Sequence, residues 1–203
     1  MTNDPLLIKI CGITRPDDAE AAVAAGADFL GFVFRPGTPR MLVPQREDWI
    51  RDIRGAETVG VFLDAPLEEV VRVRKLLGLD WVQLHGEEPD SFLEVLGRQV
   101  IRRVKVGSGV DWNRVMHLAR TCLPLFDPGA GDGLAWAWEC LADRPAGLRF
   151  GLAGGLTPEN VADAVRATRP LLVDVSSGVE STPGVKDHEK IRRFIARARS
   201  ANP

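Results

Sequence analysis

Short apolar segments alternate along the chain with longer stretches in which apolar residues recur at helical spacing. The short segments are rich in β-branched residues, as is typical of buried strands. The predicted strands cover residues 7–10, 29–33, 58–62, 81–84, 100–104, 123–126, 149–152 and 171–175. The predicted helices cover residues 16–25, 44–53, 66–77, 89–96, 111–119, 136–141, a stretch that begins at 157, and 187–199.

Several of these helices carry recognisable start and stop signals. Pro16 stands at a first helical position, and acidic residues follow it in the first turn, where they favour the positive end of the helix dipole. Gly26 and Gly78 are suitable stops. Thr157 is a suitable N-cap, with Asn160 near the first turn behind it.

Strands that alternate with helices predict a parallel sheet. Eight βα units in 203 residues leave about 25 residues for each, near the lower limit of a (β/α)₈ barrel. The alternative is a doubly wound open sheet, which usually has fewer strands and a Gly-x-Gly-x-x-Gly turn after the first strand. Here Cys11-Gly12-Ile13-Thr14 follows that strand. We therefore expect an α/β protein, a single (β/α)₈ TIM barrel domain over residues 1–203.

Composition narrows the class of protein without reaching its function. Lys and Arg number 26 against 28 Asp and Glu, a formal charge of -2, so neither nucleic acid nor a membrane surface is expected as the main partner. Three cysteines without metal-ligand spacing argue against a disulfide framework and for a reducing compartment. With no signal peptide and no apolar membrane span in the sequence, we expect a cytoplasmic protein.

Catalytic groups of such barrels lie where the strands end. Cys11 follows the first predicted strand and Asp127 the sixth. By placement alone, Cys11 is equally a general base and a small buried core residue. Asp127 is a candidate general acid or base whose surroundings raise its pKa, and the alternative is a turn Asp before Pro-Gly.

The remaining candidates are weaker. An Arg in the Pro- and Gly-rich loop after the second strand can clamp a carboxylate, although for Arg35 a solvated loop charge is the preferred interpretation. His85 follows the fourth strand, and it is a proton carrier or, by preference, a structural hydrogen-bonding residue.

Glycines and small hydroxyl residues follow the seventh and eighth strands, in Gly151–Asn160 and Asp174–Glu180. In barrels these two loops often bind phosphate through backbone N–H groups, so a phosphorylated small molecule is the expected partner. No metal-ligand cluster, nucleophile elbow or Walker loop occurs in the sequence. From the residues alone, the chain is a phosphate-binding barrel that works by acid and base.

Several strings also resemble one family in the same order along the chain. They are Lys9-Ile10-Cys11-Gly12-Ile13-Thr14, Gly31-Phe32-Val33-Phe34 running on to Pro39-Arg40, Val59-Gly60-Val61-Phe62, Gln83-Leu84-His85-Gly86, Leu152-Ala153-Gly154-Gly155-Leu156, Asp174-Val175-Ser176-Ser177-Gly178-Val179-Glu180 and Pro183-Gly184-Val185-Lys186-Asp187. Together they are similar to phosphoribosylanthranilate isomerase and cover essentially the whole chain.

The resemblance implies a (β/α)₈ barrel and a specific reaction without cofactor or metal. The reaction is the Amadori rearrangement of N-(5-phosphoribosyl)anthranilate to carboxyphenylamino-deoxyribulose phosphate in tryptophan biosynthesis. It implies Cys11 as general base and Asp127 as general acid. The substrate-binding residues that we expect are Arg40, for the anthranilate carboxylate, His85, and Gly154, Gly155, Ser177 and Gly178, of which the last four hold the phosphate. The expected assembly is a monomer or homodimer.

One stretch departs from the family pattern. After the acid, relatives usually carry Gly-Gly-x-Gly-Lys-x-Phe-Asp-Trp, whereas this chain has Leu134 in place of the Lys and Ala137 in place of the Asp. A non-catalytic sensor or a paralogue that has lost activity is therefore one alternative. Another is a different phosphate-binding barrel, similar to the tryptophan synthase alpha subunit or a thiamine phosphate synthase. Histidine-pathway isomerases with two substrates use an Asp where Cys11 stands, so that bifunctionality is not expected.

Overall fold

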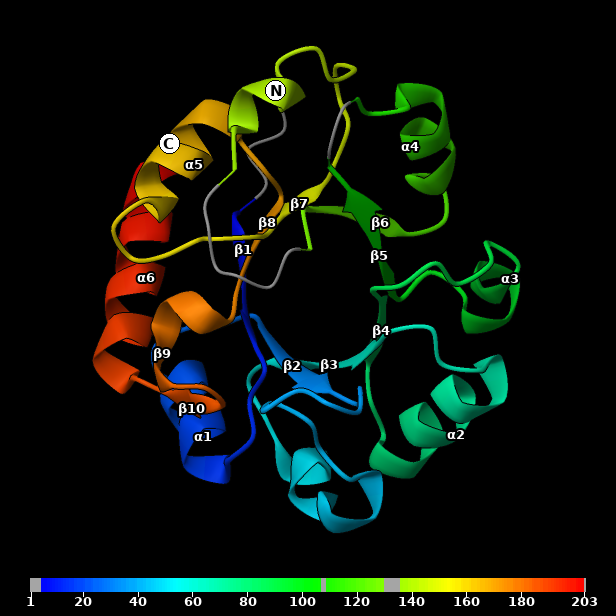
Figure 1. Ribbon diagram of the computed structural model, residues 1–203. Helices are drawn as coiled ribbons and strands as arrows, with labels where there is room; N and C mark the ends of the chain where they lie inside the picture. The colour runs from blue at the N-terminus through cyan, green and yellow to red at the C-terminus, as the bar shows by residue number, and fades with distance from the viewer. Residues whose placement is uncertain (1–4, 107–108, 130–135, 203) are drawn as a thin grey trace.

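Eight parallel strands close on themselves at the centre of the molecule, and helices surround them (Figure 1). The computed structural model describes residues 5–106, 109–129 and 136–202. The strands are β1 Leu7–Cys11, β2 Phe29–Val33, β3 Glu57–Phe62, β4 Trp81–Leu84, β5 Val100–Lys105, β6 Leu123–Asp127, β7 Gly151–Leu152 and β8 Leu172–Val175. Each strand pairs with its neighbour in sequence, and β8 pairs with β1. The predicted (β/α)₈ barrel is confirmed.

The helices on the outside largely follow their sequence signals. They are α1 Pro16–Ala24, α2 Leu67–Leu77, α3 Phe92–Leu96, α4 Trp112–Leu118, α5 Val161–Thr168 and α6 His188–Ala201. Gly78 ends α2 with a φ of 63°, a left-handed conformation that glycine adopts without a steric penalty. Asp187 caps α6 by accepting from the backbone N–H groups of Glu189 and Lys190.

Three predicted helices differ in the structure. The helix predicted over 44–53 is two 3₁₀ segments, η1 Pro44–Arg46 and η2 Asp48–Asp52. Only Ile50 within them is buried, so this stretch has no apolar stripe to stabilise a longer helix. The segment predicted over 136–141 is likewise a single 3₁₀ turn, η3 Trp138–Leu141. The seventh helix begins at Val161, because Thr157 instead caps the turn that precedes it, where its hydroxyl accepts from Glu159 N–H.

The structure contains a small antiparallel hairpin that was not predicted. In the chain it comes between β8 and α6. It follows the 3₁₀ segment η4 Ser177–Val179 and pairs β9 Glu180–Thr182 with β10 Val185–Lys186. Gly184 turns this hairpin with a φ of 85°. A Cβ at that position would lie 2.7 Å from the carbonyl oxygen of Pro39. The hairpin therefore packs closely on the loop that follows β2.

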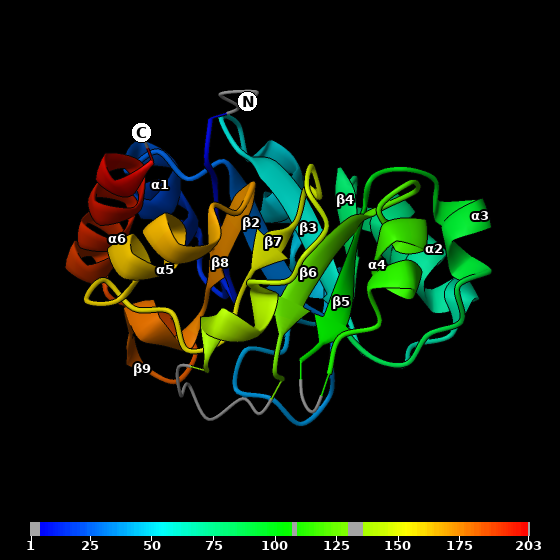
Figure 2. The same ribbon diagram turned by 90° about the horizontal axis from the view of Figure 1, so that it is seen from above.

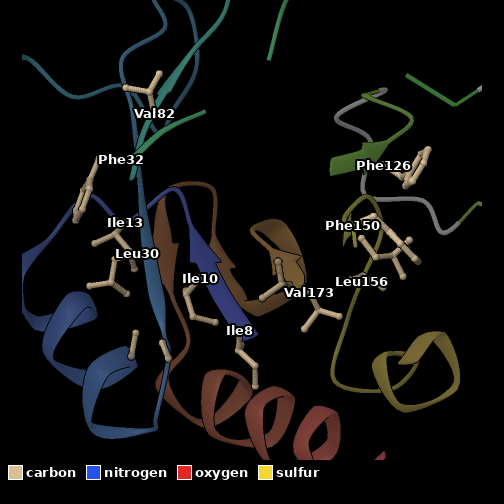
Figure 3. Packing of buried hydrophobic residues seen from close by; sticks show 14 of the residues in the cluster. Ile8, Ile10, Ile13, Leu30, Phe32, Val82, Phe126, Phe150, Leu156 and Val173 are labelled. Atoms are coloured by element: carbon tan, nitrogen blue, oxygen red, sulfur yellow. The ribbon is translucent and has the colours of Figure 1, made fainter. Parts of the chain in front are cut away.

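Two hydrophobic clusters divide the core. The larger cluster lies between the barrel and its helices, and Figure 3 shows part of it, with Ile8 and Ile10 of β1 pointing away from the barrel interior. The smaller cluster fills the barrel itself and consists of Phe29, Val59, Ile101, Leu125, Ala153 and Leu172. In the described part of the chain, no helix combines the length and apolar composition that crossing a membrane requires.

Candidate active site

A cavity of about 240 Å³ opens at the end of the barrel where the strands finish. The loops that follow these strand ends lie toward the lower edge of Figure 2. Among the predicted site residues, those that line it are Cys11, Arg40, His85, Asp127, Gly154, Gly155 and Ser177. Gly178 is not part of this lining. A Cβ at Gly178 would lie 1.9 Å from the carbonyl oxygen of Leu156, so this glycine lets the loop after β8 pack against the loop after β7.

Alternation along each strand decides which side chains reach the cavity, because successive residues point to opposite faces of a sheet. In β1, Ile8 and Ile10 belong to the outer cluster, whereas Lys9 and Cys11 face inward. The same alternation brings four residues from other strands to the cavity wall, namely Gln83, Arg103, Asp127 and Asp174. The barrel interior is therefore polar near the C-terminal ends of the strands and apolar nearer their N-terminal ends.

Cys11 ends β1 opposite Gly31 of β2. A Cβ at Gly31 would lie 2.7 Å from Sγ of Cys11 and 2.9 Å from Nζ of Lys9. The missing side chain of Gly31 thus provides the space that the thiol and the ammonium group occupy. It also shows that these two groups lie side by side inside the barrel.

Lys9 is fully buried, and its Nζ lies 2.9 Å from Oδ2 of Asp174 on the adjacent strand β8. Burial alone lowers the pKa of Lys9, but the Asp174 carboxylate and the Cys11 sulfur together outweigh it and raise that pKa. Lys9 therefore remains a cation beside Cys11. Oδ1 of Asp174 is buried and has no hydrogen-bond partner among the described residues.

Burial is also the main influence on Cys11, and it raises the pKa of the thiol above its ordinary value. The neighbouring Lys9 opposes this effect, Asp174 adds to it, and the more distant Lys186 opposes it. The two cations thus limit a shift that would otherwise suppress the thiolate further. The thiolate is the form that accepts a proton.

Asp127 ends β6 on the other side of the cavity. Its Oδ1 accepts a hydrogen bond of 2.7 Å from the N–H of Gly129, while its Oδ2 lies 3.9 Å from Nε2 of His85. Burial raises the pKa of this carboxyl, and the hydrogen bond from Gly129 and the charge of Arg103 only partly oppose the effect. Such surroundings favour a protonated carboxyl group that can act as an acid.

His85 contributes a neutral imidazole. Burial, followed by the charge of Arg103, lowers the pKa of His85 to about 4. Nε2 of Gln83 lies 3.2 Å from Nδ1 of His85, so the amide donates to Nδ1 and the ring proton is on Nε2. Nε2 lies 3.9 Å from Oδ2 of Asp127, which is longer than a hydrogen bond.

Arg103 joins the ends of three strands on the Asp127 side of the cavity. Its guanidinium donates to the carbonyl oxygens of His85, Asp127 and Pro128, at 3.0, 3.3 and 3.1 Å respectively. The three acceptors come after or at the end of β4 and β6, and Arg103 itself stands on β5. This side chain therefore fixes the position of the Asp127 backbone.

Arg40 carries a positive charge at the cavity wall, in the loop after β2. Its Nε and Nη2 donate to the two carboxylate oxygens of Glu180, each at 2.7 Å. This pairing occupies one edge of the guanidinium and leaves the Nη1–Nη2 edge for a second anion. Glu180 also accepts from the buried Lys186 at 3.0 Å, so the group of three side chains has a net charge of +1. Arg35 also lines the cavity, but it is exposed at the rim.

The loops after β7 and β8 form the remaining wall. Gly154 and Gly155 have φ values of +86° and +66°, which non-glycine residues adopt only rarely. A Cβ at Gly154 would lie 2.4 Å from Cδ of Pro128, so the backbone of this loop is in close contact with the loop after β6. Lys186 donates to the carbonyl oxygen of Ser176 at 3.1 Å and connects the loop after β8 with Glu180.

The sequence analysis did not include Lys9, Arg103, Asp174 or Glu180 among the candidate site residues. Lys9, Arg103 and Asp174 stand on barrel strands, and each has the same parity as an inward-facing residue of its own strand. Lys9 precedes Cys11 by two positions, and Arg103 has the inward parity of Ile101. Alternation along the barrel strands was therefore the signal that would have revealed Lys9, Arg103 and Asp174.

Comparison with known proteins identifies the family. The sequence profile described as N-(5'-phosphoribosyl)anthranilate (PRA) isomerase matches residues 8–197. A relative named N-(5'-phosphoribosyl)anthranilate isomerase, from Geobacter sulfurreducens, is 44% identical over 200 residues, which cover 95% of this chain and 98% of the relative. The chain belongs to the phosphoribosylanthranilate isomerase family.

Solved structures of phosphoribosylanthranilate isomerases agree with this assignment. The isomerase from Thermus thermophilus superposes with a TM-score of 0.85 at 39% identity, over 96% of this chain and 99% of that one. Another isomerase, solved in complex with reduced 1-(o-carboxyphenylamino)-1-deoxyribulose 5-phosphate, gives a TM-score of 0.83 at 36% identity with the same coverage.

The departure from the pattern of phosphoribosylanthranilate isomerases falls partly outside the described structure. Leu134 lies outside the described residues. Ala137 is exposed just before η3, and the neighbouring Trp136 donates from Nε1 to the carbonyl oxygen of Ala153 at 2.9 Å.

Within the described residues, no three His, Cys, Asp or Glu side chains gather in an arrangement that would hold a metal ion.

Substituting Gly31 by Ala tests the space that the thiol requires. The added methyl group meets Cys11 and Lys9, so we expect kcat/KM for the isomerase reaction to fall roughly 10- to 100-fold, because the sulfur is displaced. Overpacking also lowers the free energy of unfolding by about 1–3 kcal/mol. Gly109→Ala is the matched control, since a Cβ there meets nothing within 4 Å. Full activity in Gly31→Ala would contradict this account of the site.

Proposed function

We propose that this chain catalyses the Amadori rearrangement of N-(5'-phosphoribosyl)anthranilate to 1-(2-carboxyphenylamino)-1-deoxyribulose 5-phosphate in tryptophan biosynthesis. The observation that carries the proposal is that a thiol and a carboxyl group reach one cavity from different strands, Cys11 from β1 and Asp127 from β6. A relative has been solved with a reduced form of this product. The proposed reaction needs no cofactor or metal.

The two anionic ends of the substrate have suitable partners in the cavity. The Nη1–Nη2 edge of Arg40, which Glu180 does not occupy, binds the anthranilate carboxylate through two parallel hydrogen bonds. The backbone at Gly154 and Gly155, together with Ser177, binds the phosphate. Gly178 supports the phosphate side indirectly, because it allows the two loops to approach each other.

Asp127 acts first, as the general acid. Its carboxyl donates a proton to the ring oxygen of the ribose, the bond between that oxygen and the anomeric carbon breaks, and the nitrogen lone pair forms a protonated imine. The raised pKa of Asp127 keeps more of the carboxyl protonated than an ordinary Asp would. The neutral His85 beside it can donate a hydrogen bond to the carboxylate that remains.

Cys11 acts second, as the general base. The positive imine acidifies the adjacent carbon, and the thiolate of Cys11 removes the proton from it. The electrons of that C–H bond form the carbon–carbon double bond of an enolamine, and the nitrogen becomes neutral. The enol then loses its hydroxyl proton and gains one on carbon, which gives the ketone. Because Asp127 and Cys11 lie on different sides of the cavity, each can keep its own protonation state.

Substitution of the acid and the base tests the assignment. Cys11→Ser and Asp127→Asn preserve size but remove a thiolate and an ionisable proton. We expect each to lower kcat at least about 100-fold, within the contribution of a general acid or base. The measurement is the fluorescence decay of freshly generated phosphoribosylanthranilate in metal-free buffer.

Cys122→Ser is the matched control, because Cys122 is buried outside the cavity, and it should keep wild-type turnover. Rapid loss of fluorescence in either active-site variant would overturn the assigned role of that residue. A wild-type protein that binds the product analogue without turnover would instead favour a sensor or an inactive paralogue.

The raised pKa values of Asp127 and Cys11 predict a bell-shaped dependence of kcat/KM on pH. The reactive form has Asp127 protonated and Cys11 ionised. Below the pKa of Asp127 both groups are protonated and the base is missing, whereas above the pKa of Cys11 both are ionised and the acid is missing. We expect the acidic limb above the ordinary Asp value of about 3.9 and the alkaline limb above the ordinary Cys value of about 8.5.

Stopped-flow measurement of kcat/KM from about pH 4 to 11 would locate both limbs. An alkaline limb well below the ordinary thiol value would contradict the dominance of burial over Lys9 at Cys11. Unfolding of the protein at each pH, followed by circular dichroism, separates titration of the site from loss of the fold.

A further inference from the structure

Two buried acceptor atoms in the cavity lack a hydrogen-bond partner among the described residues, Oδ1 of Asp174 and Oε1 of Gln83. Buried polar atoms are nearly always paired, and leaving one unpaired costs about 1–3 kcal/mol. Both atoms accept hydrogen bonds and neither donates when Asp174 is ionised. The cavity therefore fits a ligand that brings hydroxyl or N–H donors to these places.

Asp174 is held rigidly for such a role. Its side chain is 6% exposed, and Oδ2 is anchored by Nζ of Lys9 at 2.9 Å. Lys9 also contacts the sulfur of Cys11, so one ammonium group touches both the proposed base and this carboxylate. Oδ1 consequently lies on the base side of the cavity and keeps its lone pairs for the substrate.

The chemistry of the proposed reaction identifies the donor. The carbon that loses its proton to Cys11 also carries the 2'-hydroxyl of the sugar. When the hydrogen on that carbon points at the thiolate, its hydroxyl must lie beside the base. Among the other groups near Cys11, Lys9, Lys186 and Arg40 are cationic donors, which cannot accept this hydrogen bond.

We propose that Oδ1 of Asp174 accepts a hydrogen bond from the substrate's 2'-hydroxyl and thereby turns the hydrogen on the same carbon toward Sγ of Cys11. This inference rests on the proposed function. Gln83 is assigned to a different part of the substrate, because it stands on β4 and pairs with His85 on the acid side.

A pair of ligands isolates this hydrogen bond. The first is the reduced product analogue, which has a 2'-hydroxyl, and the second is its 2'-deoxy counterpart. Titration calorimetry gives the ratio of their Kd values for the wild type and for Asp174→Asn. We expect the wild type to prefer the hydroxylated ligand about 10- to 100-fold, as for a hydrogen bond to a charged acceptor. In Asp174→Asn the ratio should fall at least about 3-fold, because a hydrogen bond to a neutral amide is weaker than one to a carboxylate, with little change in Kd for the deoxy ligand.

Glu88→Gln provides the matched control. Glu88 is also a buried carboxylate in an ion pair, with Arg102, but it does not line the cavity. This variant should lose stability and yet keep the wild-type ratio of Kd values. The double variant Lys9→Met, Asp174→Asn avoids an unpaired buried ammonium, and it replaces Asp174→Asn if that protein does not fold.

Kinetics give a second readout. Misdirection of the reacting hydrogen should lower kcat of Asp174→Asn by at least about 10-fold, with a smaller effect on KM. A wild-type ratio near one, or an unchanged ratio in the folded variants, would overturn the inference while turnover by the wild type keeps the proposed function. If the wild type neither binds the hydroxylated analogue nor turns over phosphoribosylanthranilate, the proposed function fails, and the inference fails with it.

Discussion

A closed barrel of eight strands turns every second side chain into an interior that is too narrow for bulk water. In this chain, the inward positions are apolar near the N-terminal ends of the strands and ionisable near their C-terminal ends. The ion pair between Lys9 and Asp174 makes this arrangement possible, because it compensates two buried charges across the β1–β8 seam. Breaking such a pair leaves an uncompensated charge, which is far costlier than losing a surface contact.

The ion pair also sets the electrostatic surroundings of Cys11, the proposed base. Cys11 shares its surroundings with a permanent ammonium and with the space left by Gly31. Asp127, across the cavity, instead has a backbone N–H, a neutral His85 and a guanidinium that is already bound to carbonyl oxygens. The two proposed catalytic groups thus occupy one cavity with different neighbours, so that each can keep its own protonation state.

The loops above the barrel are joined by charged side chains whose partners are distant in sequence. Glu180 connects Arg40, after β2, with Lys186 of the hairpin, and Lys186 in turn binds the carbonyl of Ser176 after β8. A continuous chain of hydrogen bonds therefore connects the proposed binding regions for the carboxylate and the phosphate of the substrate. Arg103 similarly joins two loops on the Asp127 side, where it donates to the carbonyl oxygens of His85 and Pro128.

The hydrophobic pattern by itself determined the eight strands, the barrel and the strand ends at which Cys11, His85 and Asp127 stand, because strand alternation and helical period are local properties of the chain. Local pattern failed at residues 44–53, where a stretch that begins like a helix buries only Ile50. The partners of the site residues were decided only by tertiary structure. Lys9 meets Asp174 and Arg40 meets Glu180 across 165 and 140 positions, and only barrel closure brings such distant residues together.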